Sequence, residues 1–535
     1  MKKVIAIGTI AALLLCLLPA AVLAAPGDTG SDGDFAWREL AGSRVEVAGY
    51  LGSDTVITVP GTLNGMPVVG IGNSAFSGKT AITSVTLPDG ITYLDDGAFA
   101  GCSLLADISL PDSVETIGNG CLYQCSALES ITLPESLMTL GESVFSGNAN
   151  LETVVMKNNV TTMGSNIFYN CFSLSSVTLS TRLEAISNSA FYNCSSLEHI
   201  TIPDSVASIG TAAFGGSHLQ SIDIPGSVET IGNYAFNGLG TLTSVTLHDG
   251  LKTISDGAFV TSGVTAITIP KTVTYIGLNA FAGCNGLSSV TIRGAATNLG
   301  SGAFAGCPGL HKVTSLIETG YYSNAFSTSL LTDGIYGFAG TTTEEYATAN
   351  SVPFHALQKV VFDSKGGSDV DFGYNVLGGT VDEPDMPTLS GSAFLGWYDN
   401  DDYVGDAVSF PYEVTGTQTL YAKWEALSLA SSDADGEIYT GGRVTLTPSM
   451  ADGVWDFDEA YLSRDGNTFT ALKAGKTTVT YTASGISVAY DVTIEESSLP
   501  STGQNFGWVW LFIGAAAVFV AAAAIAVRRQ RSSNT

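Results

Sequence analysis

Two short stretches, Leu128–Pro134 (LESITLP) and Ile276–Cys284 (IGLNAFAGC), contain the pattern that decides the fold of this chain. Both belong to a unit whose most regular member is a phenylalanine that returns every 22 or 23 residues. Self-similarity at this period is typical of a solenoid, in which each unit forms one coil. The twelve successive positions are Phe76, Phe99, Leu122 (in place of a phenylalanine), Phe145, Phe168, Phe191, Phe214, Phe236, Phe259, Phe281, Phe304 and Phe326.

Within each unit, the hydrophobic pattern predicts two short strands joined by tight turns. The first strand alternates apolar and polar residues, as in Ile131-Thr132-Leu133, so one of its faces is buried. The second apolar pair is often followed by glycine, as in Ile276-Gly277, because the backbone must turn sharply there. Such short units leave no room for a long helix. We therefore expect a mainly β solenoid with short helical or 3₁₀ turns near each phenylalanine, and with the first strands aligned as one parallel sheet.

LESITLP and IGLNAFAGC resemble the leucine-rich repeats of the BspA-like family. The resemblance extends over about residues 34–357. It implies a leucine-rich repeat solenoid of about twelve coils, with a cap at each end because the end coils would otherwise expose core. The expected segments are an N-terminal cap at 25–75, repeats at 76–330 and a C-terminal cap at 331–357.

Two small β-rich domains are expected after the solenoid. Gly396-Trp397-Tyr398 and Leu420–Trp424 lie among short aromatic strands with Gly and Pro turns. They resemble the Listeria–Bacteroides repeat, also called the internalin B-repeat, over residues 358–425, which implies a β-grasp-like fold. Residues 428–496 alternate again and favour a β-sandwich. Within them, Gly453-Val454-Trp455 resembles part of the bacterial Ig-like domains of group 2.

Both ends of the chain carry targeting patterns. Residues 1–24 have the basic start, apolar stretch and small final residues of a secretory signal peptide. Near the other end, Leu499-Pro500-Ser501-Thr502-Gly503 precedes an uncharged apolar run at 506–527 and then an arginine-rich tail. A helix of this run rises about 33 Å, which is enough to cross the hydrocarbon core of a membrane. The arginines would keep the tail in the cytoplasm.

This order of pentapeptide, span and basic tail at 499–535 resembles the sorting signal of Gram-positive surface proteins. The resemblance implies that a sortase cuts between Thr502 and Gly503 and joins the new carboxyl group to a peptidoglycan precursor. The protein would then be secreted, held by its membrane helix before sorting and anchored in the cell wall afterwards. A plain membrane anchor with a chance pentapeptide is the alternative.

The charge of the chain restricts its partners. Its formal net charge is −29, with 21 basic and 50 acidic residues. The two lysines of the signal and the three arginines of the tail leave with those segments, so the exported part is more acidic still. A surface this acidic repels nucleic acid and anionic lipid. We expect no nucleic-acid partner, and contact with a membrane only through the helix at 506–527.

Six cysteines follow the phenylalanine position by three residues and fall on adjacent coils in pairs. These are Cys102 and Cys125, Cys171 and Cys194, and Cys284 and Cys307. The favoured interpretation is a small buried hydrophobe at a repeat position. Disulfides between neighbouring coils are the alternative, because one coil of separation lies within disulfide reach.

Two columns of hydroxyl side chains are expected to point outward from the first strands. A broad sheet of this kind offers many weak polar contacts to a ligand. The alternative is that threonine simply suits an exposed strand and that serine is small and soluble. The candidate binding face consists of Ser84, Thr86, Ser130, Thr132, Ser176, Thr178, His199, Thr201, Ser244, Thr246, Thr268 and Thr291.

No catalytic motif emerges from the sequence. The Gly-Lys-Thr tripeptides at 78–80 and 475–477 lack the earlier glycine of a phosphate-binding loop, and the five histidines lack metal-ligand spacing. Asp399–Asp402 is expected to be a solvated loop, with calcium binding as the alternative. We expect no catalytic residue, metal or cofactor, although a carboxylate pair in a hydrolase is not recognisable from sequence.

The leading hypothesis is therefore a wall-anchored adhesin whose repeat face binds a host or bacterial surface protein or glycan. A structural surface protein without a specific ligand is the alternative.

Overall fold

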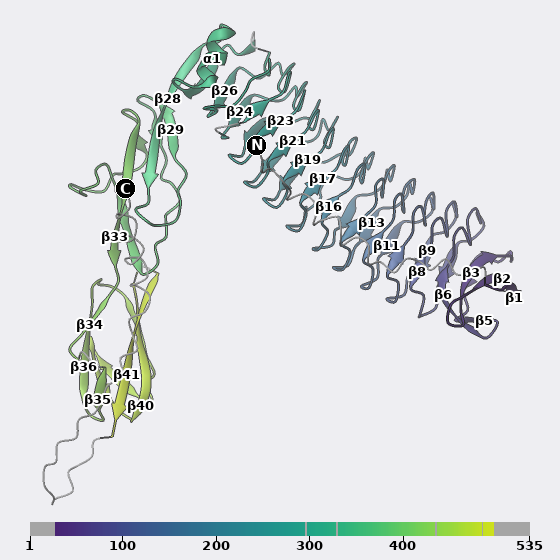
Figure 1. Cartoon of the computed structure of the whole chain (residues 1–535), viewed down its shortest axis with the longest axis horizontal. Coiled ribbons are helices and arrows are strands. Elements are labelled where there is room, and N and C mark those ends of the chain that lie inside the picture. Colours follow the sequence, from purple (N-terminus) through teal and green to yellow (C-terminus); the bar gives the residue numbers. More distant parts are fainter. Residues whose placement is uncertain (1–26, 295–296, 328–329, 434–435, 484, 497–535) are drawn as a thin grey trace, which may run out of the picture. The chain divides into compact units, whose positions relative to one another are not determined.

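The computed structural model describes residues 27–294, 297–327, 330–433, 436–483 and 485–496. These residues form two compact units, and Figure 1 labels their elements. The first unit comprises the chain up to residue 362 with 371–384 and 409–420; the second comprises 363–370, 385–408 and the chain from 421. The predicted signal peptide, the pentapeptide 499–503 and the span 506–527 lie outside the described residues. Within the described ranges, no helix is long and apolar enough to cross a membrane.

The first unit is a mainly β solenoid of about 13 turns, one more than the phenylalanine spacing predicts. The extra turn arises because the N-terminal cap is itself coiled. Its strand β3 pairs in parallel with β6, and the ring of Tyr50 stacks on Phe76 at 5.6 Å, in the place of one more phenylalanine. The strands of the cap are β1 (Thr29–Asp32), β2 (Phe35–Leu40), β3 (Arg44–Tyr50), β5 (Thr62–Leu63) and β6 (Met66–Ile71).

The second strands of successive coils form two rows of parallel pairs along the solenoid. Each strand contributes only two residues, such as Thr116–Ile117, whose isoleucine is buried. The first row continues from β6 and consists of β8 (Tyr93–Leu94), β10 (Thr116–Ile117), β12 (Thr139–Leu140) and β14 (Thr162–Met163). The second row consists of β16 (Ala185–Ile186), β17 (Ser208–Ile209), β19 (Thr230–Ile231), β21 (Thr253–Ile254), β23 (Tyr275–Ile276) and β25 (Asn298–Leu299).

The first strands do not form the single parallel sheet that was predicted. Their ladder is divided into four separate sheets, and the coil around His199 forms no strand at this position. The four groups are β4 (Val56–Thr58), β7 (Ser84–Thr86) and β9 (Asp107–Ser109); β11 (Ser130–Thr132), β13 (Thr153–Val155) and β15 (Ser176–Thr178); β18 (Ser221–Ile224) and β20 (Ser244–Leu247); and β22 (Ala266–Ile269), β24 (Ser289–Ile292), β26 (Lys312–Ser315), β27 (Gly334–Phe338) and β28 (Phe354–Asp363).

The core of the solenoid is a ladder of aromatic rings. From Phe145 to Phe326 the rings of successive coils stack with centroid separations between 4.9 and 5.4 Å. Leu122 interrupts the ladder between Phe99 and Phe145 and is itself fully buried. Each coil covers the ring of its neighbour, so no coil buries its own core alone.

Each corner around the phenylalanine is a series of hydrogen-bonded turns, not the predicted helical or 3₁₀ turn. The residue two positions before the phenylalanine has a positive φ in all twelve units, and so does the residue two positions after it wherever that residue is described. A left-handed residue on each side interrupts any right-handed helix. Glycine or asparagine fills most of these positions, but Tyr234 and Thr261 hold φ values of 57° and 56°.

The seven described cysteines are free and buried. In the six that follow the phenylalanine position, the thiol lies 3.0–3.2 Å from the carbonyl oxygen of the phenylalanine one coil earlier, to which it donates. Cys194, for example, donates to Phe168. Burial raises the pKa of Cys171 to about 12. The thiols are therefore small buried groups that also connect adjacent coils.

The C-terminal end of the solenoid adds α1 (Thr342–Ala349), with Tyr346 and Ala347 buried against the last coils. Strand β28 then pairs antiparallel with β29 (Gly373–Val376), and β30 (Thr380–Val381) pairs with β32 (Tyr412–Glu413). In the second unit, β31 (Ser392–Tyr398) pairs antiparallel with β33 (Gln418–Ala426) through Tyr421 and the residues after it.

The rest of the second unit consists of two four-stranded sheets around one core that contains Phe469, Val479 and Val492. One sheet has the order β34 (Leu429–Ser431), β36 (Arg443–Pro448), β39 (Thr468–Ala471), β38 (Leu462–Asp465), and the other β35 (Glu437–Tyr439), β41 (Ile486–Glu495), β40 (Gly475–Ala483), β37 (Val454–Asp456). The β-grasp-like and Ig-like assignments remain predictions.

Candidate functional site

The outward side of the first strands, called here the first-strand face, carries the predicted hydroxyl columns. In the register of the strands, Thr153 lies between Ser130 and Ser176, and Val155 lies between Thr132 and Thr178. Further along, Thr291 lies between Thr268 and Thr314. Parallel pairing thus aligns hydroxyl groups from sequence positions 23 residues apart.

Ten of the twelve predicted face residues are exposed, and Ser84 and Thr291 are half-buried. The interruptions of the ladder divide them, however, so they do not form one surface of uniform geometry. Ser84 donates a hydrogen bond of 3.2 Å to Asp107 on the next coil, and His199 and Thr201 lie outside any strand. Binding through the whole array remains a prediction.

A depression of about 280 Å³ lies on the first-strand face where the ladder is interrupted between β20 and β22. We call it the β20–β22 depression. Its apolar lining comes from Val245, Leu247, Ala266 and Ile267, and its hydroxyl lining from Thr246, Thr268, Ser289 and Thr291. Three of these hydroxyl residues belong to the predicted face. The depression itself was not predicted, because sequence does not reveal where a ladder is interrupted.

The capping strands continue the face with aromatic side chains that the sequence analysis did not include. Tyr336 lies opposite Thr314 and next to His355, whose ring stacks on it at 4.4 Å. The ammonium group of Lys312 lies 4.2 Å from the centre of the Tyr336 ring. Lys312 and His355 cover the faces of the Tyr336 ring, so the edge of the ring is the part that a ligand can reach.

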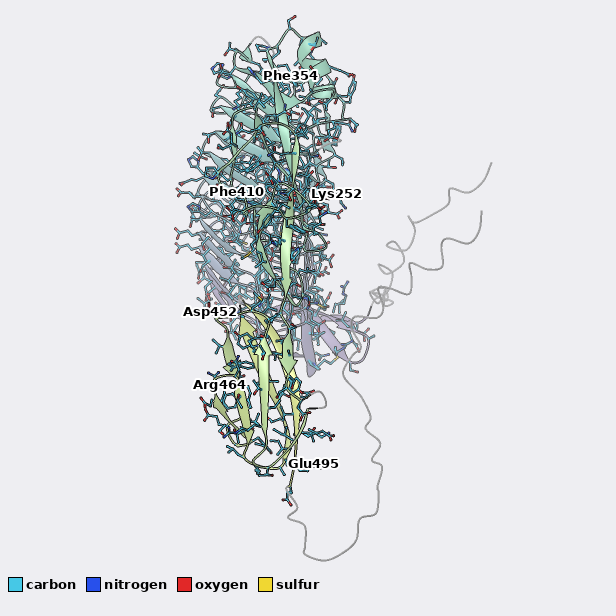
Figure 2. The ribbon with its side chains drawn as sticks, turned by 90° about the vertical axis from the view of Figure 1, so that its left-hand side faces the viewer. Lys252, Phe354, Phe410, Asp452, Arg464 and Glu495 are labelled. Atoms are coloured by element: carbon cyan, nitrogen blue, oxygen red, sulfur yellow. The ribbon has the colours of Figure 1, made fainter. Side chains whose placement is uncertain are left out.

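Two ion pairs connect neighbouring coils in this part of the repeats. His248 Nε2 lies 2.8 Å from Asp223 Oδ1, and Lys252, labelled in Figure 2, reaches Glu229 at 2.5 Å. Both pairs are solvent-exposed and hence weak.

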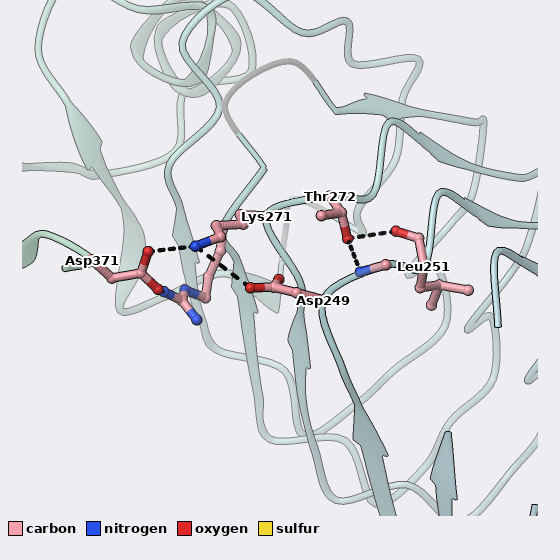
Figure 3. A network of polar contacts seen from close by, with 7 residues as sticks. Asp249, Leu251, Lys271, Thr272 and Asp371 are labelled. Carbon is pink, nitrogen blue, oxygen red and sulfur yellow. Dashed lines mark hydrogen bonds and ion pairs between the residues drawn. The ribbon is translucent and has the colours of Figure 1, made fainter. Parts of the chain in front are cut away.

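A denser network, the Asp371 clamp, lies just beyond the ends of β22 and β24 (Figure 3). Lys271 Nζ lies 2.6 Å from Asp371 Oδ1 and 3.6 Å from Asp249 Oδ2, and Arg293 also bonds to Asp371. The hydrogen bond from Lys271 lowers the pKa of Asp371, to which Arg293 also contributes, and Asp371 raises the pKa of Lys271. The clamp fastens Asp371, at the start of the segment that contains β29, to the repeats.

The first-strand face presents mainly hydroxyl side chains. In the ranges that the structure describes, no group of three or more His, Cys, Asp or Glu side chains is placed to hold a metal ion. In the loop Asp399–Asp402, for which calcium binding was the alternative, the side-chain oxygen of Asn400 accepts a hydrogen bond of 2.8 Å from the backbone amide of Val404. We identify no nucleophile paired with a base on the first-strand face.

Comparison with known families identifies two segments. Residues 69–198 and 184–311 match the BspA type leucine rich repeat region, and residues 359–423 match the Listeria-Bacteroides repeat domain. The chain thus contains BspA-type leucine-rich repeats followed by a Listeria-Bacteroides repeat.

Two curated proteins of Evansella cellulosilytica share short segments with this chain. One, named as a Gly-rich membrane protein, is 42% identical over 67 residues, which cover 12% of this chain and 8% of that protein. The other, named as a membrane protein, is 36% identical over 115 residues, or 21% of this chain and 17% of that protein. The chain therefore spans less than a fifth of the length of either relative.

Several solved structures are similar to the chain. A leucine-rich repeat protein from Bacteroides ovatus is 25% identical, with a TM-score of 0.45, over 58% of this chain and 78% of that one. A leucine rich cell surface protein from Faecalibacterium prausnitzii is 22% identical, with a TM-score of 0.31, over 56% and 96%. A pneumococcal vaccine antigen is 20% identical, with a TM-score of 0.38, over 62% and 97%.

Proposed function

We propose that this chain, with its BspA-type leucine-rich repeats, is a cell-wall-anchored surface adhesin. A sortase links it to a peptidoglycan precursor at Thr502, and the first-strand face binds a protein or glycan on a host or neighbouring cell. The β domains that follow act as a spacer. The observation that carries the proposal is the long stacked array whose outward hydroxyl columns are not used to hold the fold together, since most of these side chains are exposed.

A structural coat protein without a specific ligand is the second candidate. The same exposed serine and threonine side chains favour it, because they also suit a sheet that needs only to stay soluble. The two candidates differ in one respect: an adhesin gives attachment that a soluble copy of the protein competes away, whereas a coat protein does not.

The adhesive function is tested with Gram-positive cells that display the whole chain. We expect such cells to attach to at least one surface among matrix proteins, mucins and epithelial cells. Purified residues 27–496 should block this attachment when added in excess. Attachment equal to that of cells lacking the chain, together with altered cell aggregation, would favour the coat protein.

The anchoring step is tested separately by Thr502→Ala. A sortase must form its acyl bond at this residue, so we expect the variant to leave the wall fraction and appear in the medium or membrane. Ser501→Ala is the matched control, because the signal tolerates change at that position in the family it resembles. Wall linkage that persists in Thr502→Ala would contradict the assignment.

A further inference from the structure

We propose that the β20–β22 depression binds one terminal ring of a neutral glycan. The inference rests on the proposed adhesive function and specifies the chemical class of its ligand. Three independent observations carry it: the two-sided chemistry of the lining, the interrupted strand ladder and a lining without ionisable side chains.

The lining has an apolar part and a hydroxyl part. Val245 and Leu247 are only half-buried, whereas the residues at the same inward positions of β18, β22 and β24 are buried. Thr246 and Thr268 are exposed beside them. A sugar ring has the matching composition, with hydroxyl groups at its edge and C–H groups on its face. Burying that face against the valine and leucine removes apolar surface from water.

The interrupted ladder leaves backbone groups available. In the described part of the chain no ladder pairs β20 with β22, and the backbone bond that connects the two coils at this point, from Thr265 N to Thr243 O at 3.2 Å, precedes both strands. The coils bond to each other again at β21 and β23. Peptide groups that lack a ladder partner need water or a ligand to satisfy them. Hydroxyl groups of a sugar are both donors and acceptors and meet this need.

The electrostatics favour a neutral ligand. None of the lining residues is ionisable, although Lys312 lies opposite the lining residue Ser289 in the strand register. A sugar with an acidic group would be repelled by a chain of net charge −29. The volume of about 280 Å³ lies just below the usual range of drug-sized sites, so we expect one ring to enter rather than an oligomer.

The test uses residues 27–496, which include both units, and an array of oligosaccharides ending in galactose, N-acetylglucosamine, fucose or sialic acid. We expect binding to at least one neutral terminus and none to the sialylated ones. The double variant Thr268→Val/Thr291→Val keeps the shape of the lining and removes two hydroxyl groups. It should weaken that binding at least tenfold, since each hydrogen bond contributes about 1 kcal/mol.

Thr132→Val/Thr178→Val is the matched control, because it removes two hydroxyl groups of the same face away from the depression. It should bind like the unchanged protein, and circular dichroism checks that both variants are folded. Equal loss in both double variants, or binding confined to sialylated glycans, would overturn the inference. If the protein binds no glycan but its cells still attach to matrix proteins, the inference fails while the adhesive function stands.

Discussion

Thr261 has a backbone conformation that its side chain disfavours. Its φ is 56°, whereas the same position of the neighbouring coils is occupied by Gly238 and Gly283. A β-branched residue in the left-handed region costs about 1–2 kcal/mol, which exceeds the entropic cost of glycine, about 0.5–1 kcal/mol. We therefore predict that Thr261→Gly raises the free energy of unfolding by up to about 1 kcal/mol, measured by urea denaturation.

The reverse change at the same position of the preceding coil is the control. A Cβ atom added to Gly238 would meet nothing within 4 Å, so Gly238→Thr tests the backbone alone. It should lower the free energy of unfolding by about 1 kcal/mol. If both variants shift stability in the same direction, conformational strain is not the cause.

At the scale of single residues, some of the positions with a positive φ could be predicted from the sequence. Glycines before and after the phenylalanine, such as Gly97 and Gly101, mark positions that require a positive φ. Thr261 and Tyr234 carry no such signal, and only the repeat register identifies them. The register holds them in the unfavourable conformation because each coil must follow the path of its neighbours.

At the scale of the coil, the cysteine column combines packing with a hydrogen bond between coils. Burial raises the pKa of Cys102 to about 11 and of Cys171 to about 12, so their thiolates, the reactive species, are rare near pH 8. Cys284 differs, because a hydrogen bond from Cys307 lowers its pKa. Cys307, which donates that bond, has a raised pKa.

We predict that native residues 27–496 react only slowly with Ellman's reagent at pH 8, and that all seven thiols react after unfolding in urea. The physical reason is that burial opposes reaction at all seven thiols and that a raised pKa also opposes it at every thiol except Cys284. Both effects are lost on unfolding. A single reactive thiol in urea without reductant would instead reveal three disulfides between adjacent coils, with Cys121 left unpaired. That result would contradict the free thiols of this structure.

The sequence predicted the coil better than it predicted the face. The period of the phenylalanines fixed the stacking, because each ring must cover the next, as Phe259 covers Phe281 at 4.9 Å. The strand ladder is interrupted where neighbouring coils pack in slightly different ways. The repeat pattern in the sequence does not reveal these differences. For this reason Thr246 and Thr268 were predicted as parts of a column and not as neighbours across a depression.

At the scale of the whole molecule, contacts between segments that are far apart in the chain could not be predicted from the sequence. Asp371 reaches Arg293, 78 residues earlier, and Lys271, 100 residues earlier. No spacing rule connects such positions, because their proximity depends on how the chain continues after the last coil. Asp371 belongs to the same compact unit as the repeats, whereas residues 363–370 belong to the other unit.

The acid dependence of the Asp371 clamp gives a final prediction. The partners of Asp371 lower its pKa in the folded protein. The stabilisation is therefore fully present above the unfolded-state pKa of about 3.9, and it is lost as the pH falls through the folded-state pKa. Lys271, whose pKa is raised, contributes fully below about 10.4 and loses its contribution as the pH rises further. The side chains are one-third to one-half exposed, so each pair contributes less than about 1 kcal/mol.

Asp371→Asn should therefore lower the melting temperature of residues 27–496 between about pH 4 and pH 10. The difference from the unchanged protein should vanish near pH 2 and shrink in 0.5 M salt, which screens exposed pairs. Calorimetry across this range measures it. Asp369→Asn, a neighbouring carboxylate without a recorded ion pair in the described residues, should leave the melting temperature unchanged. A difference that persists at pH 2 would mean that Asp371 acts through packing and not through its charge.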